Sequence, residues 1–314
     1  MSKRIGMDLG GTNLRVGVVE RTTVVWEHKV NVRFSERCRA DDPRQATELV
    51  LREVGEALRY SLQRHPDVTA LGIALPGIVD PDSGHLREAP NIPGIRDLDL
   101  AGSLSRQFHL PVMVENDALA AAWGAYQTHP ERPHSLIFLG LGTGIGGGLI
   151  LNGVPYRGER GFAMEVGHLR VVPQGRLCGC GARGCLERYA SASGVALDYQ
   201  EATGELLDSA AVARRAHLGD SHARTAFTRA GGHLGSACAG LMKVLDIPHL
   251  AVGGGLAASW ALMDEAFREA VAAESMASLR DRYTLRIMND NDHLGMLGAA
   301  LLAKPLEQSK DASP

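Results

Sequence analysis

Short apolar runs that stop at glycine or proline alternate along the chain with segments in which apolar residues recur at helical spacing. The first part predicts three strands of an antiparallel meander, then a helix whose apolar side chains include Leu49, Val54 and Leu58. Two buried strands and a further helix come next. The predicted ranges are 5–8, 15–20 and 24–30 for the meander, 45–64 for the helix, 69–75 and 110–114 for the strands, and 118–127 for the further helix.

A similar order of elements begins again near residue 135. A strand runs into a glycine turn and is followed by a second strand, which ends at Asn152-Gly153, a dipeptide typical of hairpin turns. A long helix and a strand that stops at three glycines follow, and one more helix is expected near the end. The predicted ranges are 135–141 and 146–151 for the hairpin, 223–245 for the long helix, 249–252 for the strand and 295–304 for the last helix.

This repetition predicts an α/β protein with two related lobes and a cleft between them. The small lobe is expected to comprise residues 1–117 and a returning C-terminal helix, 296–304. The large lobe is expected over 118–295 and includes a cysteine-rich loop. The polar tail, residues 305–314, is expected to be disordered.

Charge and composition argue against several classes of protein. The chain has 314 residues and a formal net charge of −3, with basic residues interspersed among acids, so no surface for a nucleic acid is expected. It contains no apolar run of about 18 residues that would span a membrane. No signal-peptide pattern precedes the first strand, so the expected location is the cytoplasm.

Two glycine turns that follow strands are suited to phosphate groups. In Asp-Leu-Gly-Gly-Thr at residues 8–12, backbone N–H groups and the Thr12 hydroxyl can bind phosphate oxygens, and Asp8 can hold Mg²⁺. A plain hairpin turn is the alternative. The turn at 142–144 is followed by a strand rather than a helix, which argues against a dinucleotide-binding fingerprint. Because the strand–glycine–threonine turn occurs twice, the phosphate interpretation is favoured.

Asp117 stands where a predicted strand ends and a predicted helix begins. A lone Asp at such a position is usually the N-cap of the helix. Alternatively, its carboxylate accepts the proton of a substrate hydroxyl. Phosphoryl transfer tolerates a weak base, because its loose transition state mainly requires positioning. Asp117 taken alone is consistent with both interpretations.

The most specific pattern is one histidine followed by three closely spaced cysteines. His168, Cys178, Cys180 and Cys185 suit a tetrahedral Zn²⁺ with no open position, which is typical of a structural site. Free thiols and a redox pair are alternatives, although the spacing Cys-x-Cys is not the redox spacing Cys-x-x-Cys. Glu165 and Glu187 flank this region and can each accept two sugar hydroxyls, or they are ordinary surface acids.

Together these motifs resemble the ROK family (repressor, open reading frame, kinase), especially its bacterial glucokinases. The resemblance extends from Ile5 to about Ala303. The matching segments are residues 8–12, 76–77, 91–94, 115–117, 142–148, 165–168, 178–187 and 253–255.

The resemblance implies an actin-like ATPase (ribonuclease H-like) fold, usually a homodimer, and a kinase in which Asp117 is the catalytic base. His168 would place one ring nitrogen on zinc and the other toward a sugar hydroxyl. The residues implied to bind the sugar are Asn91, Asn116, Asp117, Glu165, His168 and Glu187. Those implied to bind ATP are Asp8, Gly10, Gly11, Thr12, Gly142, Thr143, Gly144, Gly254, Gly255 and Leu256.

The expected reaction is the conversion of glucose to glucose 6-phosphate by ATP. Kinases of N-acetylhexosamine, mannose or fructose are the nearest alternatives. An alternative of another class is a non-catalytic sugar-sensing regulator; a repressor of this family would need an added DNA-binding segment before residue 8. The chain departs from the family at Met164, where these kinases usually have glycine, and the bulky side chain is expected to narrow or reshape the sugar pocket.

Overall fold

The computed structural model describes residues 3–288 and 293–305, which form two compact units. Unit 1 contains residues 3–132, 155–163 and 293–305, and unit 2 contains residues 133–154 and 164–288. Unit 1 thus continues past the boundary drawn from the sequence at residue 117, because α4 (Asp117–Gln127) packs against α10 (Leu294–Leu302) of the same unit. Most of the predicted tail, residues 306–314, lies outside the described residues.

Unit 1 is built on a five-stranded sheet with the order β3-β2-β1-β4-β8. The first three strands form the predicted antiparallel meander, and β4 and β8 extend the sheet in parallel. The strands are β1 (Lys3–Leu9), β2 (Asn13–Glu20), β3 (Thr23–Asn31), β4 (Val68–Leu75) and β8 (Val112–Asn116).

Unit 2 repeats this topology with the order β11-β10-β9-β12-β13. An antiparallel β9–β10 hairpin takes the place of β1–β2, and β12 and β13 again extend the sheet in parallel. The strands are β9 (Leu136–Leu141), β10 (Ile145–Leu151), β11 (Val154–Pro155), β12 (His249–Gly253) and β13 (Thr284–Ile287). The two sheets confirm the predicted α/β class and its internal repeat.

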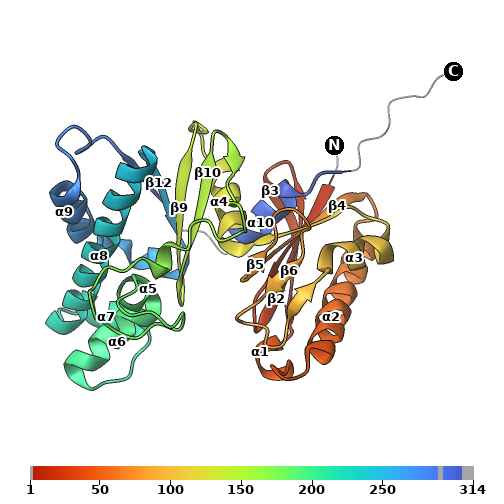
Figure 1. Cartoon of the computed structure of the whole chain (residues 1–314), viewed down its shortest axis with the longest axis horizontal. Helices are drawn as coiled ribbons and strands as arrows, with labels where there is room; N and C mark the ends of the chain where they lie inside the picture. Colours follow the sequence, from red (N-terminus) through yellow and green to blue (C-terminus); the bar gives the residue numbers. More distant parts are fainter. Residues whose placement is uncertain (1–2, 289–292, 306–314) are drawn as a thin grey trace. The chain divides into compact units, whose positions relative to one another are not determined.

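Helices cover both sheets, and none in the described ranges is apolar over a length that would cross a bilayer (Figure 1). Unit 1 also has a small antiparallel sheet of β5 (Ile78–Val79), β6 (Leu86–Glu88) and β7 (Arg96–Leu98). The other helices of unit 1 are α1 (Phe34–Arg37), α2 (Pro43–Arg64) and α3 (Leu100–Phe108). Those of unit 2 are α5 (Glu187–Ala190), α6 (Ala192–Thr203), α7 (Ser209–His217), α8 (Ser221–Leu245) and α9 (Asp264–Glu274), with the 3₁₀ segments η1 (Val166–His168) and η2 (Gly255–Leu262).

Successive residues of β1 point to opposite faces of the sheet in unit 1, and each face packs against a different layer. Ile5, Met7 and Leu9 are buried in a core shared with α2 and α3, as the period of two predicts. Gly6 faces the opposite layer, where α10 crosses the sheet. A Cβ atom at Gly6 would lie 2.0 Å from the Met296 carbonyl oxygen, and one at Gly72 of β4 would lie 1.8 Å from that of Ala299. The missing side chains therefore allow α10 to rest directly on the strands.

The same close packing joins α10 to α4, the helix that begins at Asp117. A Cβ atom added to Gly298 would lie 1.7 Å from the carbonyl oxygen of Ala120. Gly298→Ala is therefore expected to force the two helices apart and to destabilise the protein by about 1–3 kcal/mol, the usual cost of overpacking. A lower melting temperature and a lower urea midpoint would report the loss.

The matched control is Gly240→Ala in α8, where an added Cβ meets no atom within 4 Å. Alanine has the higher helix propensity, so this variant is expected to gain roughly 0.5–1 kcal/mol. If Gly298→Ala proved as stable as Gly240→Ala, close helix contact would not explain the glycine at 298.

Candidate active site and metal centre

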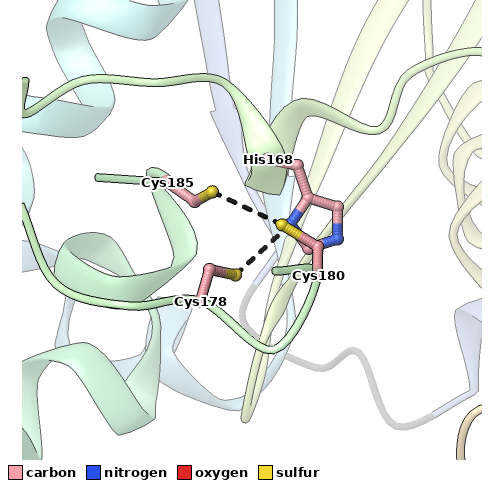
Figure 2. Close-up of side chains that lie close together, drawn as sticks. All are labelled: His168, Cys178, Cys180 and Cys185. Atoms are coloured by element: carbon pink, nitrogen blue, oxygen red, sulfur yellow. Dashed lines mark hydrogen bonds between the residues drawn. The ribbon is translucent and has the colours of Figure 1, made fainter. Parts of the chain in front are cut away.

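The predicted metal ligands come together in unit 2. The ligand atoms of His168, Cys178, Cys180 and Cys185 all lie within 4.8 Å of one another. Cys180 Sγ is 3.7 Å from Cys185 Sγ, and Cys178 Sγ is 3.6 Å from Nδ1 of His168. Figure 2 shows the four side chains directed toward one another. The pattern of one histidine and three cysteines thus corresponds to a real cluster.

Local turns and one half-buried arginine shape the loop that carries the cysteines. Gly184 has a φ of +81°, and a Cβ there would lie 1.7 Å from the carbonyl oxygen of Val172, so only glycine fits. The side chain of Arg176 donates to Asp198 and Glu201 and lies over the ring of Tyr189, 4.8 Å from its centroid. These contacts fasten the start of the loop to α5 and α6.

Three crowded thiols next to an imidazole fit a bound cation. Burial raises the pKa of the Cys185 thiol to about 12, and its hydrogen bonds to Cys180 and Cys178 add to the shift. The backbone N–H of Ala182 lowers the pKa of Cys180. Three neighbouring thiolates repel one another unless a positive ion lies among them. Tetrahedral Zn²⁺ with sulfur and nitrogen ligands matches this donor set.

His168 and Glu165 belong to a short segment that lies directly on β10. A Cβ at Gly147 would come within 2.4 Å of the carbonyl oxygen of Met164, and one at Gly167 within 2.4 Å of that of Ile145. His168 Nε2 is 3.8 Å from Oε2 of Glu165. The imidazole therefore turns Nδ1 toward the cysteines and Nε2 toward Glu165, as a double role for His168 requires.

Met164 adopts the left-handed conformation, with a φ of +66°. Long side chains avoid this region, at a cost of order 1–2 kcal/mol. The Met164 carbonyl accepts a 2.6 Å hydrogen bond from the N–H of Val166, which closes a tight turn centred on Glu165. The Met164 side chain packs against the core of unit 2, so its bulk is directed into the protein. Its effect on the sugar pocket stays a prediction.

Glu187 lies against the second glycine turn. Its Oε2 accepts a hydrogen bond of 3.1 Å from the N–H of Ile145, and its Oε1 is 4.0 Å from Cys178 Sγ. A Cβ at Gly144 would lie only 2.2 Å from Oε2. Unit 2 thus brings together the predicted sugar residues Glu165, His168 and Glu187, the metal cluster and the turn at 142–144.

The first glycine turn lies in unit 1, beside Asn91. The turn is closed by a 2.9 Å hydrogen bond from the N–H of Gly10 to the carbonyl of Asn13. A Cβ at Gly11 would lie 2.8 Å from the carbonyl oxygen of Asn91. Asp8 precedes the turn in β1. Unit 1 therefore places Asp8, the residues 10–12 and Asn91 in one region.

The helix that follows β8 is capped by Asn116, so the N-cap interpretation of Asp117 is wrong by one residue. Oδ1 of Asn116 accepts from the N–H groups of Ala118 and Leu119, and Nδ2 donates to the carbonyl of Gly77. Asp117 is the first helical residue and is partly exposed. The cap role therefore falls to Asn116, and Oδ1 of Asp117 also accepts a 2.8 Å hydrogen bond from the N–H of Ala118. The sugar contact expected of Asn116 stays a prediction.

Sequence reasoning missed an ion pair beside Asp117. Glu115 is 3% exposed, and its Oε2 is 2.6 Å from the guanidinium of Arg157. Burial raises the pKa of Glu115, and Arg157 opposes that shift. Arg157 is 42 positions away along the chain. The feature of the sequence that could have indicated this ion pair is an acidic residue at the end of an apolar strand.

The predicted adenosine residues lie at the end of β12 in unit 2. Gly254 has a φ of +87° and packs on the backbone of Leu141. Gly255 has no atom within 4 Å of an added Cβ. Leu256 is 3% exposed and belongs to the core of unit 2. The backbone of this turn is therefore uncovered at Gly255, while the Leu256 side chain packs into the core of unit 2.

The chain matches the family model described as "ROK family" over residues 4–305. It belongs to the ROK family. The glucokinase of Thermotoga maritima is 31% identical over 96% of this chain and 97% of its own. The N-acetylmannosamine kinase of Escherichia coli (strain SE11) is also 31% identical, over 96% of this chain and 98% of its own. A ROK family glucokinase from Streptomyces griseus, solved with glucose and AMPPNP, superposes with a TM-score of 0.78 at 31% identity, covering 96% and 99% of the two chains. These likenesses agree with the actin-like ATPase fold expected from the repeated sheets.

Proposed function

We propose that this protein transfers the γ-phosphate of ATP to a hexose, and that glucose, converted to glucose 6-phosphate, is the main substrate. The observation that carries the proposal is the grouping of Glu165, His168 and Glu187 around the metal cluster in a ROK chain. Glucokinases and N-acetylmannosamine kinases of similar length support a sugar kinase. The structure in complex with glucose and AMPPNP supports glucose and ATP as substrates.

In unit 2, the sugar is held by polar groups that match its hydroxyls. The carboxylates of Glu165 and Glu187 accept hydrogen bonds from hydroxyl groups. Nε2 of His168 donates one, because ligation through Nδ1 leaves the proton on the other ring nitrogen. Asn91 and Asn116 are the other polar residues proposed to bind the sugar. A hydroxyl held by several fixed groups loses freedom before the reaction, which lowers the barrier to transfer.

Asp117 takes the proton from the attacking hydroxyl. Asn116 caps α4, and a 2.8 Å hydrogen bond from the N–H of Ala118 to Oδ1 of Asp117 orients the Asp117 carboxylate at the start of the helix. The partial positive charge of the helix N-terminus favours its ionised form. A carboxylate is a weak base, but phosphoryl transfer depends mainly on positioning and charge stabilisation.

Two glycine turns are the proposed phosphate-binding elements. Backbone N–H groups of residues 10–12 and 142–144, with the hydroxyls of Thr12 and Thr143, bind phosphate oxygens. The backbone at Gly254 and Gly255 lies beside adenosine, with Leu256 behind it. The carboxylate of Asp8 offers the oxygen ligands that Mg²⁺ prefers. Asp8 would hold the ion through its bound waters. Mg²⁺, when bound, offsets the negative charge of the phosphate groups.

Zn²⁺ would be held by His168, Cys178, Cys180 and Cys185, whose ligand atoms fit it in number and type. With four protein ligands, it supplies structural stability rather than an open coordination position. Its contribution to the reaction is to fix His168 and the loop around Glu187. We further propose that the enzyme acts in the cytoplasm as a homodimer and has no nucleic-acid or membrane partner.

The proposed activity is tested with a hexose panel and Mg-ATP in an assay coupled to ADP formation. Glucose is expected to give the largest kcat/KM, ahead of mannose, fructose and the N-acetylhexosamines. A preparation of Asp117→Asn serves as the control for contaminating kinases. A maximum for N-acetylmannosamine would transfer the proposal to that sugar. Turnover of no hexose, with sugar binding retained, would support a sugar-sensing regulator instead.

A further inference from the structure

Glu187 joins two parts of the proposed site that have different tasks. It belongs to the sugar-binding set, yet its Oε2 accepts the N–H of Ile145, the residue directly after the phosphate-binding turn 142–144. The contact is tight, since a single added carbon at Gly144 would lie 2.2 Å from that oxygen. One carboxylate of the proposed sugar-binding set therefore contacts the proposed phosphate-binding turn.

The glycine turn is attached at both ends to the segment that carries Glu187. At its start, the Gly142 carbonyl accepts a hydrogen bond of 2.9 Å from the N–H of Ala192, the first residue of α6. At its end, Ile145 donates to Glu187. Across the turn, the Gly142 N–H donates to the Gly144 carbonyl at 2.9 Å. A displacement of the Glu187 side chain would consequently shift the backbone of the turn.

We propose that Glu187 couples sugar binding to nucleotide binding, an inference that rests on the proposed kinase function. Oε2 of Glu187 accepts the Ile145 N–H and places a negative charge beside Gly144. That charge repels phosphate oxygens at short range. A sugar hydroxyl that donates to Glu187 competes for the carboxylate and offsets part of its charge. Bound sugar therefore strengthens nucleotide binding, and bound nucleotide strengthens sugar binding by the same factor.

The first test measures the Kd of Mg-AMPPNP by calorimetry with and without saturating glucose. In the wild type, glucose is expected to tighten nucleotide binding by about 5- to 150-fold, the usual range of such coupling. Glu187→Gln keeps an acceptor for Ile145 but removes the charge. It is expected to bind the nucleotide about 3- to 10-fold more tightly than wild type when sugar is absent, because the repulsion is gone.

The matched control is Glu165→Gln, which removes a second carboxylate of the sugar set, one that faces His168. It should weaken glucose binding and leave the sugar-free nucleotide Kd unchanged. A sugar-free nucleotide Kd that is the same in Glu187→Gln and wild type would overturn the coupling. Because this measurement needs no sugar, it remains decisive if glucose is the wrong hexose.

The second test alters the glycine turn at 142–144 and measures the Kd of the hexose. Gly144→Ala must displace Glu187, whereas at Gly142 an added Cβ meets no atom within 4 Å. Without nucleotide, Gly144→Ala is expected to raise the hexose Kd by about fivefold or more, and Gly142→Ala to leave it unchanged. Equal hexose Kd values would refute the joint role of Glu187, while failure of wild type to phosphorylate any hexose would refute the kinase proposal separately.

Discussion

Asp117→Asn is expected to lower kcat for the phosphorylated hexose by about 10²- to 10⁴-fold, the usual contribution of a positioned general base. Asparagine is nearly the same size but cannot accept the hydroxyl proton. Because Asn116 is the N-cap, α4 should keep its stability in the variant. Steady-state kinetics with hexose and Mg-ATP would measure the loss, and calorimetry would measure a hexose Kd close to that of wild type.

Asp208→Asn is the matched control for this substitution. Asp208 is the exposed N-cap of α7 and accepts a hydrogen bond from the N–H of Ala211, a role that asparagine performs equally well. Its kcat should equal that of wild type. If Asp117→Asn retained kcat within about tenfold of wild type, the loss would fall below the usual range for a general base and the role of Asp117 would have to be reassigned.

Cys180→Ala is expected to abolish zinc binding and to destabilise unit 2 by roughly 5 kcal/mol or more, as for other structural zinc sites. Cys180 is exposed, so the substitution removes little packing. The loss would come from the missing ligand and from the repulsion among the remaining groups. Elemental analysis should find one zinc per wild-type chain and close to none in the variant, and the melting temperature should fall.

Cys238→Ala is the control, because Cys238 is a fully buried thiol in α8 outside the cluster. It should keep its zinc and lose only the small packing contribution of one sulfur atom. A strong chelator should lower the melting temperature of wild type and leave that of Cys180→Ala unchanged. Wild-type protein that contains no zinc after purification in zinc-supplemented medium would falsify the site.

Strands and helices could largely be predicted because each buries one face at its own period. β1 alternates Ile5, Met7 and Leu9 with smaller or polar residues, and the pattern fits a sheet covered on both sides. The metal cluster was predictable because its ligands lie within one short stretch of chain. The repeated order of strands followed from the repeated glycine turns.

Contacts between distant positions could not be predicted in the same way. Arg157 pairs with Glu115, and Glu187 accepts from Ile145, each across 42 positions. Neither partner has a local pattern that identifies the other. The capping role of Asn116 was missed because aspartate and asparagine are equally good caps, and only the backbone decides which of two neighbours has the extended conformation.

The dependence of unit 1 on α10 has a consequence for how the chain folds during synthesis. β1 and α4 are made before the hairpin of unit 2, while α10, which covers Gly6 and contacts Gly124, is made after unit 2. Unit 2 can therefore complete its core on the ribosome first. Until residues 293–305 emerge, the part of the first sheet around Gly6 and Gly72 lacks the helix that covers it.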